Sequence, residues 1–135
     1  MFNIHKIDDG RVPAWEQLPV SAITPKVGLA LVMNGGQLAI ASGNAKPAYI
    51  CMCEKETTCA AGEIIPVVRV QPDIIFETTF SAAATSVKAG SKLTLATNGL
   101  QVTATTGGAA EVIDMDGTAA GDKVRVRFVE VAAAS

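Results

Sequence analysis

The chain has 135 residues, of which 49% are hydrophobic and 18% are charged, and its net charge is −2 at pH 7. This length fits one domain, and the composition excludes a disordered chain. The basic residues form no cluster that could neutralise phosphates, so we expect no nucleic-acid binding. The longest apolar stretches, such as Val27–Met33, fall far short of the roughly 20 residues that span a bilayer, so we expect no membrane insertion. The first nine residues lack the apolar core of a secretory signal, which favours folding in a reducing cytoplasm.

Residues 1–26 differ from the rest of the chain. Pro13, Pro19 and Pro25 recur every six residues, and each is incompatible with a central strand or a helix interior. The apolar residues between them follow no steady period. We predict an extended N-terminal arm over residues 1–26 that packs on a partner, followed by a β domain over residues 27–135. A loop wrapped over its own domain is the alternative. The predicted partner-binding residues of the arm are Phe2, Ile4, Ile7, Val12, Trp15 and Leu18.

Alternating apolar residues on both sides of Asn34-Gly35-Gly36 predict a first β-hairpin. A two-residue loop at Asn34-Gly35 pairs Leu31 with Leu38 and Leu29 with Ile40. In that register the apolar side chains of both strands share one face.

A second hairpin is predicted around Asn98-Gly99, a dipeptide that favours a type I′ turn because both central positions of that turn need positive φ. The corresponding register pairs Leu95 with Val102 and Leu93 with Ala104. Apolar and polar residues then separate onto opposite faces of the hairpin.

The most regular strand pattern is Lys123–Phe128, which places Lys123, Arg125 and Arg127 on one face and apolar residues on the other. We predict a mostly β fold of about nine short strands, arranged as a compact small barrel or sandwich. A short helix is expected around Phe80–Val87, where alanines cluster. The remaining predicted strands are Ala48–Met52, Ile64–Val70, Ile74–Phe80 and Glu111–Asp114.

Catalytic motifs are not found in the sequence. The only histidine, His5, lies in the predicted arm, which cannot fix it in a catalytic triad. Gly90-Ser91-Lys92 resembles the end of a phosphate-binding loop, but Thr85 stands where the first glycine is required. We predict that the protein is not an enzyme.

The three cysteines leave a metal site open as the weaker alternative. Cys51, Cys53 and Cys59 could supply three thiolates to zinc with His5 as a fourth ligand, but structural zinc sites usually use two cysteine clips. Cys51 and Cys53 are also too close in sequence for an easy disulfide. We favour buried, reduced cysteines that act as small apolar residues.

Asp114-Met115-Asp116-Gly117 resembles a fragment of a calcium-binding loop. Arg125 occupies the twelfth position, where such a loop needs a bidentate glutamate, so an Asp-Gly turn is the better interpretation. We expect no metal and no other cofactor.

The phrase Ala-Gly-polar recurs before strands at residues 61–63, 89–91 and 120–122, and the last of these opens the basic-apolar strand that ends at Phe128. With the Thr/Ala-rich hairpins, these features make the segment from Val27 to Phe128 resemble the small head decoration (capsid-stabilising) proteins of tailed bacteriophages and prophages. The resemblance implies a compact β-tulip-like domain. It also implies homotrimers on the outside of the capsid, with the major capsid protein as partner.

The same resemblance implies a function without catalysis. Such proteins bridge neighbouring capsomers and strengthen the head, and their N-terminal arms commonly add a strand to a capsid-protein sheet. Deleting residues 1–20 is then expected to abolish attachment and to leave the fold intact. A different virion structural module, such as a fibre base or connector, is the first alternative, and a small ligand-binding or enzymatic β-barrel is the second.

Overall fold

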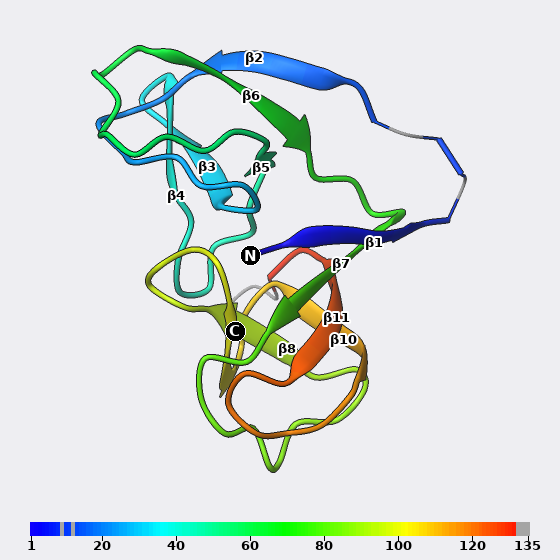
Figure 1. Ribbon diagram of the computed structural model, residues 1–135. Coiled ribbons are helices and arrows are strands. Elements are labelled where there is room, and N and C mark those ends of the chain that lie inside the picture. Colours follow the sequence, from blue (N-terminus) through cyan, green and yellow to red (C-terminus); the bar gives the residue numbers. More distant parts are fainter. Residues whose placement is uncertain (9, 12, 132–135) are drawn as a thin grey trace.

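The computed structural model describes residues 1–8, 10–11 and 13–131, which form eleven strands in two antiparallel sheets (Figure 1). Sheet A has the strand order β1-β7-β11-β10-β8-β9, and sheet B has the order β2-β6-β5-β3-β4. The strands are β1 (Asn3–Ile7), β2 (Trp15–Pro19), β3 (Ala30–Asn34), β4 (Gln37–Ile40), β5 (Tyr49–Cys51), β6 (Ile64–Arg69), β7 (Ile74–Thr79), β8 (Lys92–Leu95), β9 (Val102–Thr106), β10 (Ala110–Met115) and β11 (Lys123–Phe128).

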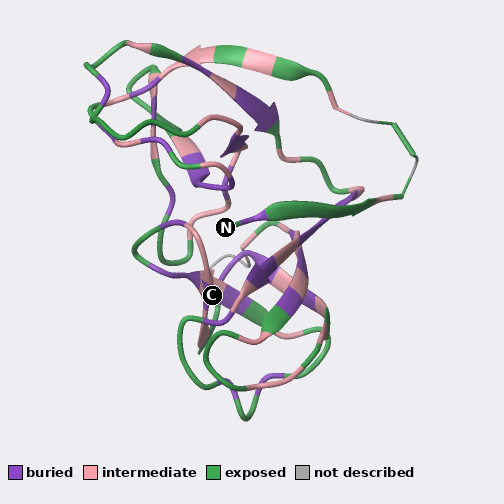
Figure 2. Cartoon of the chain, viewed as in Figure 1, coloured by how far each residue is buried: buried purple, intermediate pink, exposed green. Residues whose placement is uncertain are grey.

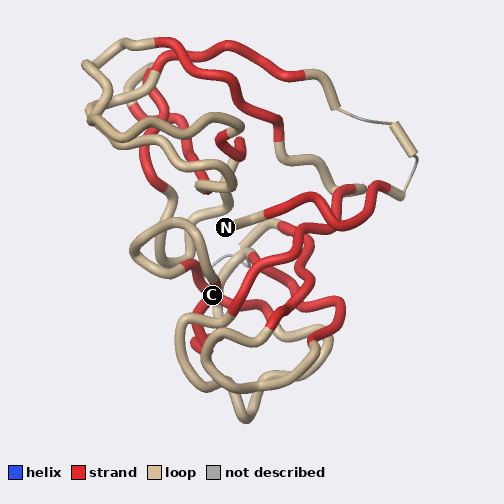
Figure 3. Tube along the Cα trace, viewed as in Figure 1, coloured by secondary structure: helices blue, strands red, loops and turns tan. Residues whose placement is uncertain are grey.

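The predicted β fold is confirmed, in its sandwich-like rather than its closed-barrel form. Each predicted strand has a counterpart within a few residues, and β1 and β2 are additional strands contributed by residues 1–26. Within the described residues every element is a strand, turn or loop (Figure 3). The sheets are linked by a bridge between Gly43 and Leu95.

The helix predicted around Phe80–Val87 is wrong. The segment forms turns because backbone groups at its start and middle bond to the loop at residues 118–122 and leave no run of helical hydrogen bonds. Phe80 N–H donates to Asp122 O over 3.1 Å, and Ala84 N–H donates to Thr118 O over 2.7 Å. These bonds hold the side chains of Phe80 and Ala84 buried against residues of sheet A.

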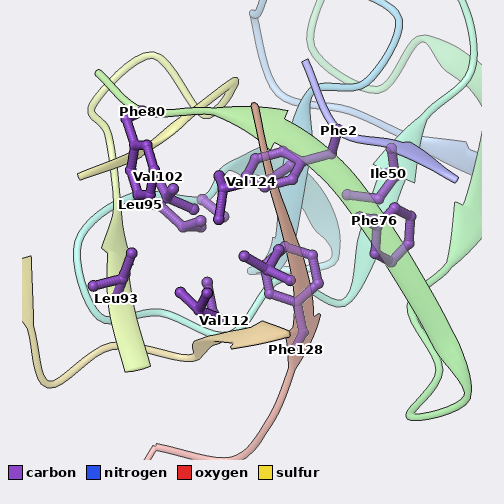
Figure 4. Close-up of a cluster of buried hydrophobic side chains, with 14 of the residues drawn as sticks. Phe2, Ile50, Phe76, Phe80, Leu93, Leu95, Val102, Val112, Val124 and Phe128 are labelled. Atoms are coloured by element: carbon purple, nitrogen blue, oxygen red, sulfur yellow. The ribbon is translucent and has the colours of Figure 1, made fainter. Parts of the chain in front are cut away.

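Two clusters of buried side chains fill the molecule. Core 1 is formed mainly by side chains from the strands of sheet A and includes Phe2, Phe76, Phe80 and Phe128 (Figure 4). A few residues of sheet B, such as Ile50, also belong to it. Core 2 lies on the opposite face of sheet B. Its members are Val20, Ile23, Leu29, Leu31, Leu38, Cys51, Cys59, Ile65 and Val67. Because sheet B has apolar residues on both faces, its central strands separate the two cores.

The first hairpin is present, but its predicted register is wrong by one loop position. Leu31 pairs with Ile40 and Met33 with Leu38, so the loop consists of Gly35 and Gly36. Both glycines have positive φ, +61° and +83°, and two adjacent glycines supply this conformation without the steric cost that Asn34 would meet. The shift preserves the faces, because every pairing moves by two residues.

The second hairpin is partly as predicted. Leu95 pairs with Val102, but Leu93 pairs with Thr106 because an irregularity interrupts the ladder between Leu93 and Leu95. The type I′ turn is wrong: among the described residues only glycines have positive φ, and Asn98 is therefore excluded. Its side-chain Oδ1 accepts the Leu100 N–H over 2.9 Å, which stabilises a wider loop.

Candidate interaction surface

Phe2, which was predicted to bind a partner, lies in core 1 of the protein's own domain. Its side chain is 2% exposed, and the centroid of its ring lies 5.3 Å from that of Phe128. The Phe2 N–H donates to Gly28 O over 2.9 Å. Gly28 has φ +84°, and a Cβ atom at this position would lie 2.8 Å from Phe2 N. The start of the chain is therefore locked into the fold by burial and by close backbone packing.

β1 is an edge strand of the protein's own sheet A. It pairs antiparallel with β7, and a bulge between Ile4 and Lys6 interrupts the ladder. Ile7 is half-buried against core 1. At the end of the strand, Arg127 Nη2 lies 2.8 Å from Asp8 Oδ2. The predicted free arm is not observed here, because these residues are bonded to their own domain.

β2 is the corresponding edge strand of sheet B and pairs antiparallel with β6. Leu18 is half-buried against core 2. Glu16 receives two hydrogen bonds from the Arg69 guanidinium, of 3.0 and 3.1 Å, and these bonds lower the pKa of the Glu16 carboxyl. Val12 lies outside the described residues. For residues 1–8, 10–11 and 13–26, the structure thus favours the alternative in which this segment packs on its own domain.

Trp15 begins β2 and is the most exposed large apolar residue of the described chain, at 57%. The register pairs Trp15 with Val68 and Pro19 with Ile64 of β6, and partners across an antiparallel ladder share a face. Ile64 is 53% exposed. Trp15, Gln17 and Pro19 of β2 therefore share one side with Ile64 and Pro66 of β6, and we call this side the β2–β6 face. The face is apolar except for Gln17, which is exposed. Figure 2 shows β2 as exposed or intermediate along its whole length.

A small apolar cleft lies between sheet B and β1. Its volume is about 100 Å³. Ile50, one of its lining residues, pairs with Val68, which in turn pairs with Trp15, so the cleft and the β2–β6 face belong to the same side of sheet B. Ile4, which is 38% exposed, closes the other side of the cleft. The full lining is Phe2, Asn3, Ile4, Val27, Ile50, Met52 and Phe76.

β2 on the β2–β6 face and β1 beside the cleft are terminal strands of their sheets. A terminal strand presents backbone N–H and C=O groups on its outer side, where an extended segment of another protein can add a strand. An adjacent exposed tryptophan supplies the large, rigid contact area that protein interfaces favour. The arrangement is chemically suited to binding a polypeptide.

The outward face of sheet A carries a charge network centred on Arg125. Its Nη1 lies 3.1 Å from Asp114 Oδ1 and 2.6 Å from Asp116 Oδ1, and its Nε lies 3.2 Å from Glu77 Oε2. The predicted outward placement of the basic residues of β11 is thus confirmed. The same contacts explain the segment that resembles a calcium loop, because a guanidinium neutralises its carboxylates.

The histidine and the three cysteines are the remaining side chains that could support other chemistry. His5 Nδ1 on β1 lies 3.7 Å from Glu77 Oε2. Cys51 and Cys59 are buried, as expected, whereas Cys53 is half-buried, and all three are free thiols. Among residues 1–8, 10–11 and 13–131, no group of three or more His, Cys, Asp or Glu side chains is arranged to hold a metal ion. The same ranges contain no helix long and apolar enough to cross a membrane.

Sequence reasoning identified Trp15 and Ile4 but missed their neighbours at the surface. Ile64 comes from β6 and Met52 directly follows β5, and only the fold of sheet B brings them to the side that carries Trp15. No signal in the sequence marks Ile64 as exposed, because its exposure of 53% follows from the fold. No protein-family model matches this chain, and no curated protein is similar to it in sequence.

Proposed function

We propose that this protein is a non-catalytic structural protein that binds the outer surface of a bacteriophage head and stabilises the head by bridging capsomers. It is made in the host cytoplasm and works as a homotrimer on the virion. The observation that carries this proposal is the exposure of Trp15 on a terminal strand beside an apolar face. The sequence resemblance to head decoration proteins supplies the class of partner, the major capsid protein.

The mode of binding follows from the two edge strands. A segment of the major capsid protein adds to β2, its backbone completes the open side of the ladder, and Trp15 packs on its side chains. Each contact of this kind is small, but many copies on one capsid lattice multiply the strength of attachment.

The test is a binding assay with the full chain and expanded heads assembled from the major capsid protein of the same phage. Deleting residues 1–20 is unsuitable, because the deletion removes Phe2 from core 1 together with β1 and β2. Trp15→Ala is the test variant, and Met33→Ala is the matched control, because Met33 is an apolar residue of β3 that is 45% exposed.

We expect the wild type and Met33→Ala to sediment with heads at equal occupancy and Trp15→Ala to show at least a tenfold weaker affinity, as is typical of an aromatic anchor. Wild-type protein that does not bind expanded heads would refute the proposal, and binding to tails instead would favour a fibre base or connector. Light scattering with metal analysis on the same sample provides a second test. A metal-free trimer, free or formed on heads, supports the proposal, whereas a metal-loaded particle or a stable dimer contradicts it.

A further inference from the structure

Two of the three thiols lie side by side where β5 ends. The Sγ atoms of Cys51 and Cys53 are 3.9 Å apart, and the Cys51 thiol donates to the carbonyl oxygen of Cys53 over 3.2 Å. Two cysteines this close in sequence do not bridge easily, but these two thiols already lie near each other. β5 ends at Cys51, so Cys53 lies in the loop beyond the strand. A disulfide bond of about 2.05 Å needs a movement of only about 2 Å.

The surroundings of the two thiols differ. Cys51 is 0% exposed, and both of its backbone groups bond to the segment that precedes β3: its N–H donates to Leu29 O over 2.9 Å, and its carbonyl accepts from Gly28 N–H over 2.8 Å. Cys53 lies beyond the strand and is half-buried. Cys59 is 3% exposed. Cys53 is thus the most accessible of the three thiols to a reagent in solution. The buried Cys51 Sγ lies 3.9 Å from Cys53 Sγ.

We propose that Cys51 and Cys53 are a site of reversible oxidation, which a low-molecular-weight disulfide such as oxidised glutathione converts to an intramolecular disulfide. The Cys53 thiolate attacks one sulfur of the glutathione disulfide, the S–S bond of the reagent breaks, and one glutathione leaves as a thiol after taking up a proton. Cys51 then loses its proton and attacks Cys53 Sγ, which expels the second glutathione. Two cysteine thiols are oxidised, and one glutathione disulfide is reduced to two thiols.

The two steps proceed at different rates. Burial raises the pKa of the Cys51 thiol to about 12, so very little of it is thiolate near neutral pH. The mixed disulfide on Cys53 therefore accumulates before Cys51 resolves it, and the second step accelerates as the pH rises. The backbone bonds of Cys51 keep β5 in place, so the disulfide forms by movement of Cys53 without loss of the fold.

The wild-type chain provides the first test, without any substitution. The reduced protein is incubated with oxidised glutathione at about pH 8, quenched with acid, alkylated and mapped by mass spectrometry. We expect one alkylated thiol, Cys59, a Cys51–Cys53 disulfide, and a glutathione adduct on Cys53 at early times. A chain that keeps three free thiols, an adduct that never resolves, or a bridge that includes Cys59 would overturn the proposal.

Variants assign the two roles. Cys51→Ala should stop at the glutathione adduct on Cys53, and Cys53→Ala should leave Cys51 unmodified over the same time. Cys59→Ala is the matched control and should form the disulfide at the wild-type rate. Circular dichroism establishes that each variant is folded, and a Cys53→Ala protein that is folded yet oxidised as fast as the wild type contradicts the assignment. The outcome does not depend on capsid binding, so this proposal and the proposed function fail separately.

Discussion

The ring of Phe2 packs at a tilt of 60° against the ring of Phe128, which joins the start of the chain to the last strand of sheet A. Phe128 also contacts Phe76 of β7, with ring centroids 5.5 Å apart. Phe2 thus completes an aromatic cluster whose other two rings, Phe76 and Phe128, come from β7 and β11. Docking of β1 beside β7 and burial of Phe2 are two parts of one interaction.

Replacing Phe2 with alanine should therefore lower the free energy of unfolding by about 3–5 kcal/mol, the usual cost of removing a buried phenylalanine side chain. Ile4→Ala, on the same segment but 38% exposed, is the control and should cost less than about 1.5 kcal/mol. Urea unfolding followed by circular dichroism measures both. Equal effects of the two substitutions would show that Phe2 is not part of the core in solution.

Gly28→Ala should destabilise the protein more than Gly36→Ala. The two glycines have nearly equal φ, +84° and +83°, so both alanines meet a similar backbone cost of about 1–2 kcal/mol. Only at Gly28 would the new Cβ lie 2.6 Å from Met1 Cβ and 2.8 Å from Phe2 N, whereas nothing lies within 4 Å at Gly36.

The difference in the free energy of unfolding between these two variants measures how closely the N-terminus packs on Gly28. We expect it to exceed about 1 kcal/mol in thermal or urea unfolding, because overpacking at a fixed backbone typically costs this much or more. Identical melting temperatures for the two variants would contradict the packing of Met1 and Phe2 on Gly28.

The strands were predictable where the pattern is local. Val124, Val126 and Phe128 alternate with charged residues, and this alternation alone defines β11. The register of the first hairpin was not predictable from a local pattern, because Asn34, Gly35 and Gly36 offer two possible two-residue loops. The loop that forms is the one in which both residues are glycines, which adopt positive φ more readily than asparagine.

The N-terminal segment was misread for a different reason. A proline is tolerated in an edge strand, so Pro19 ends β2 without disrupting sheet B, although the prolines suggested a chain without strands. The burial of Phe2 depends on Phe128, at the other end of the chain, and no local pattern carries that contact. Trp15 could be proposed as a partner-binding residue from its type alone, but its neighbour Ile64 depends on the pairing of β2 with β6.

Stability should fall on the alkaline side because of the buried Cys51 thiol. Its pKa is raised from 9.0 to about 12 by burial, so from about pH 9 upward the unfolded chain releases a proton that the folded chain retains. The contribution of the buried Cys51 thiol to the free energy of unfolding is complete below pH 9. It is lost as the pH rises toward 12, by at most about 1.4 kcal/mol per pH unit.

Other groups titrate in the same range, so the wild type is compared with Cys51→Ala under reducing conditions. Urea midpoints measured between about pH 8 and pH 10.5 should fall more steeply for the wild type than for the variant. Parallel pH profiles would indicate that Cys51 is accessible to water in the folded protein.

The Glu16–Arg69 pair should hold β2 on β6 in a manner that depends on pH and salt. Hydrogen bonding to Arg69 lowers the pKa of the Glu16 carboxyl below its ordinary value of 4.5. The ion pair therefore contributes fully to the free energy of unfolding above pH 4.5, and this contribution is lost as the pH falls through the lowered pKa of the folded protein. A double-mutant cycle with Glu16→Gln and Arg69→Gln should give a favourable coupling at neutral pH. The coupling should shrink in high salt and vanish in acid, and a coupling unchanged by either would contradict the ion pair.

Trp15→Ala should leave stability almost unchanged, within about 0.5 kcal/mol, because the side chain is 57% exposed and contributes little to either core. As the only tryptophan, Trp15 also reports on its own surroundings. Its fluorescence in the free protein should be quenched readily by acrylamide, and the quenching should decrease when expanded heads are added. A buried emission spectrum in the free protein, or a loss of stability comparable to that of Phe2→Ala, would mean that Trp15 packs inside the molecule and is not available to a partner.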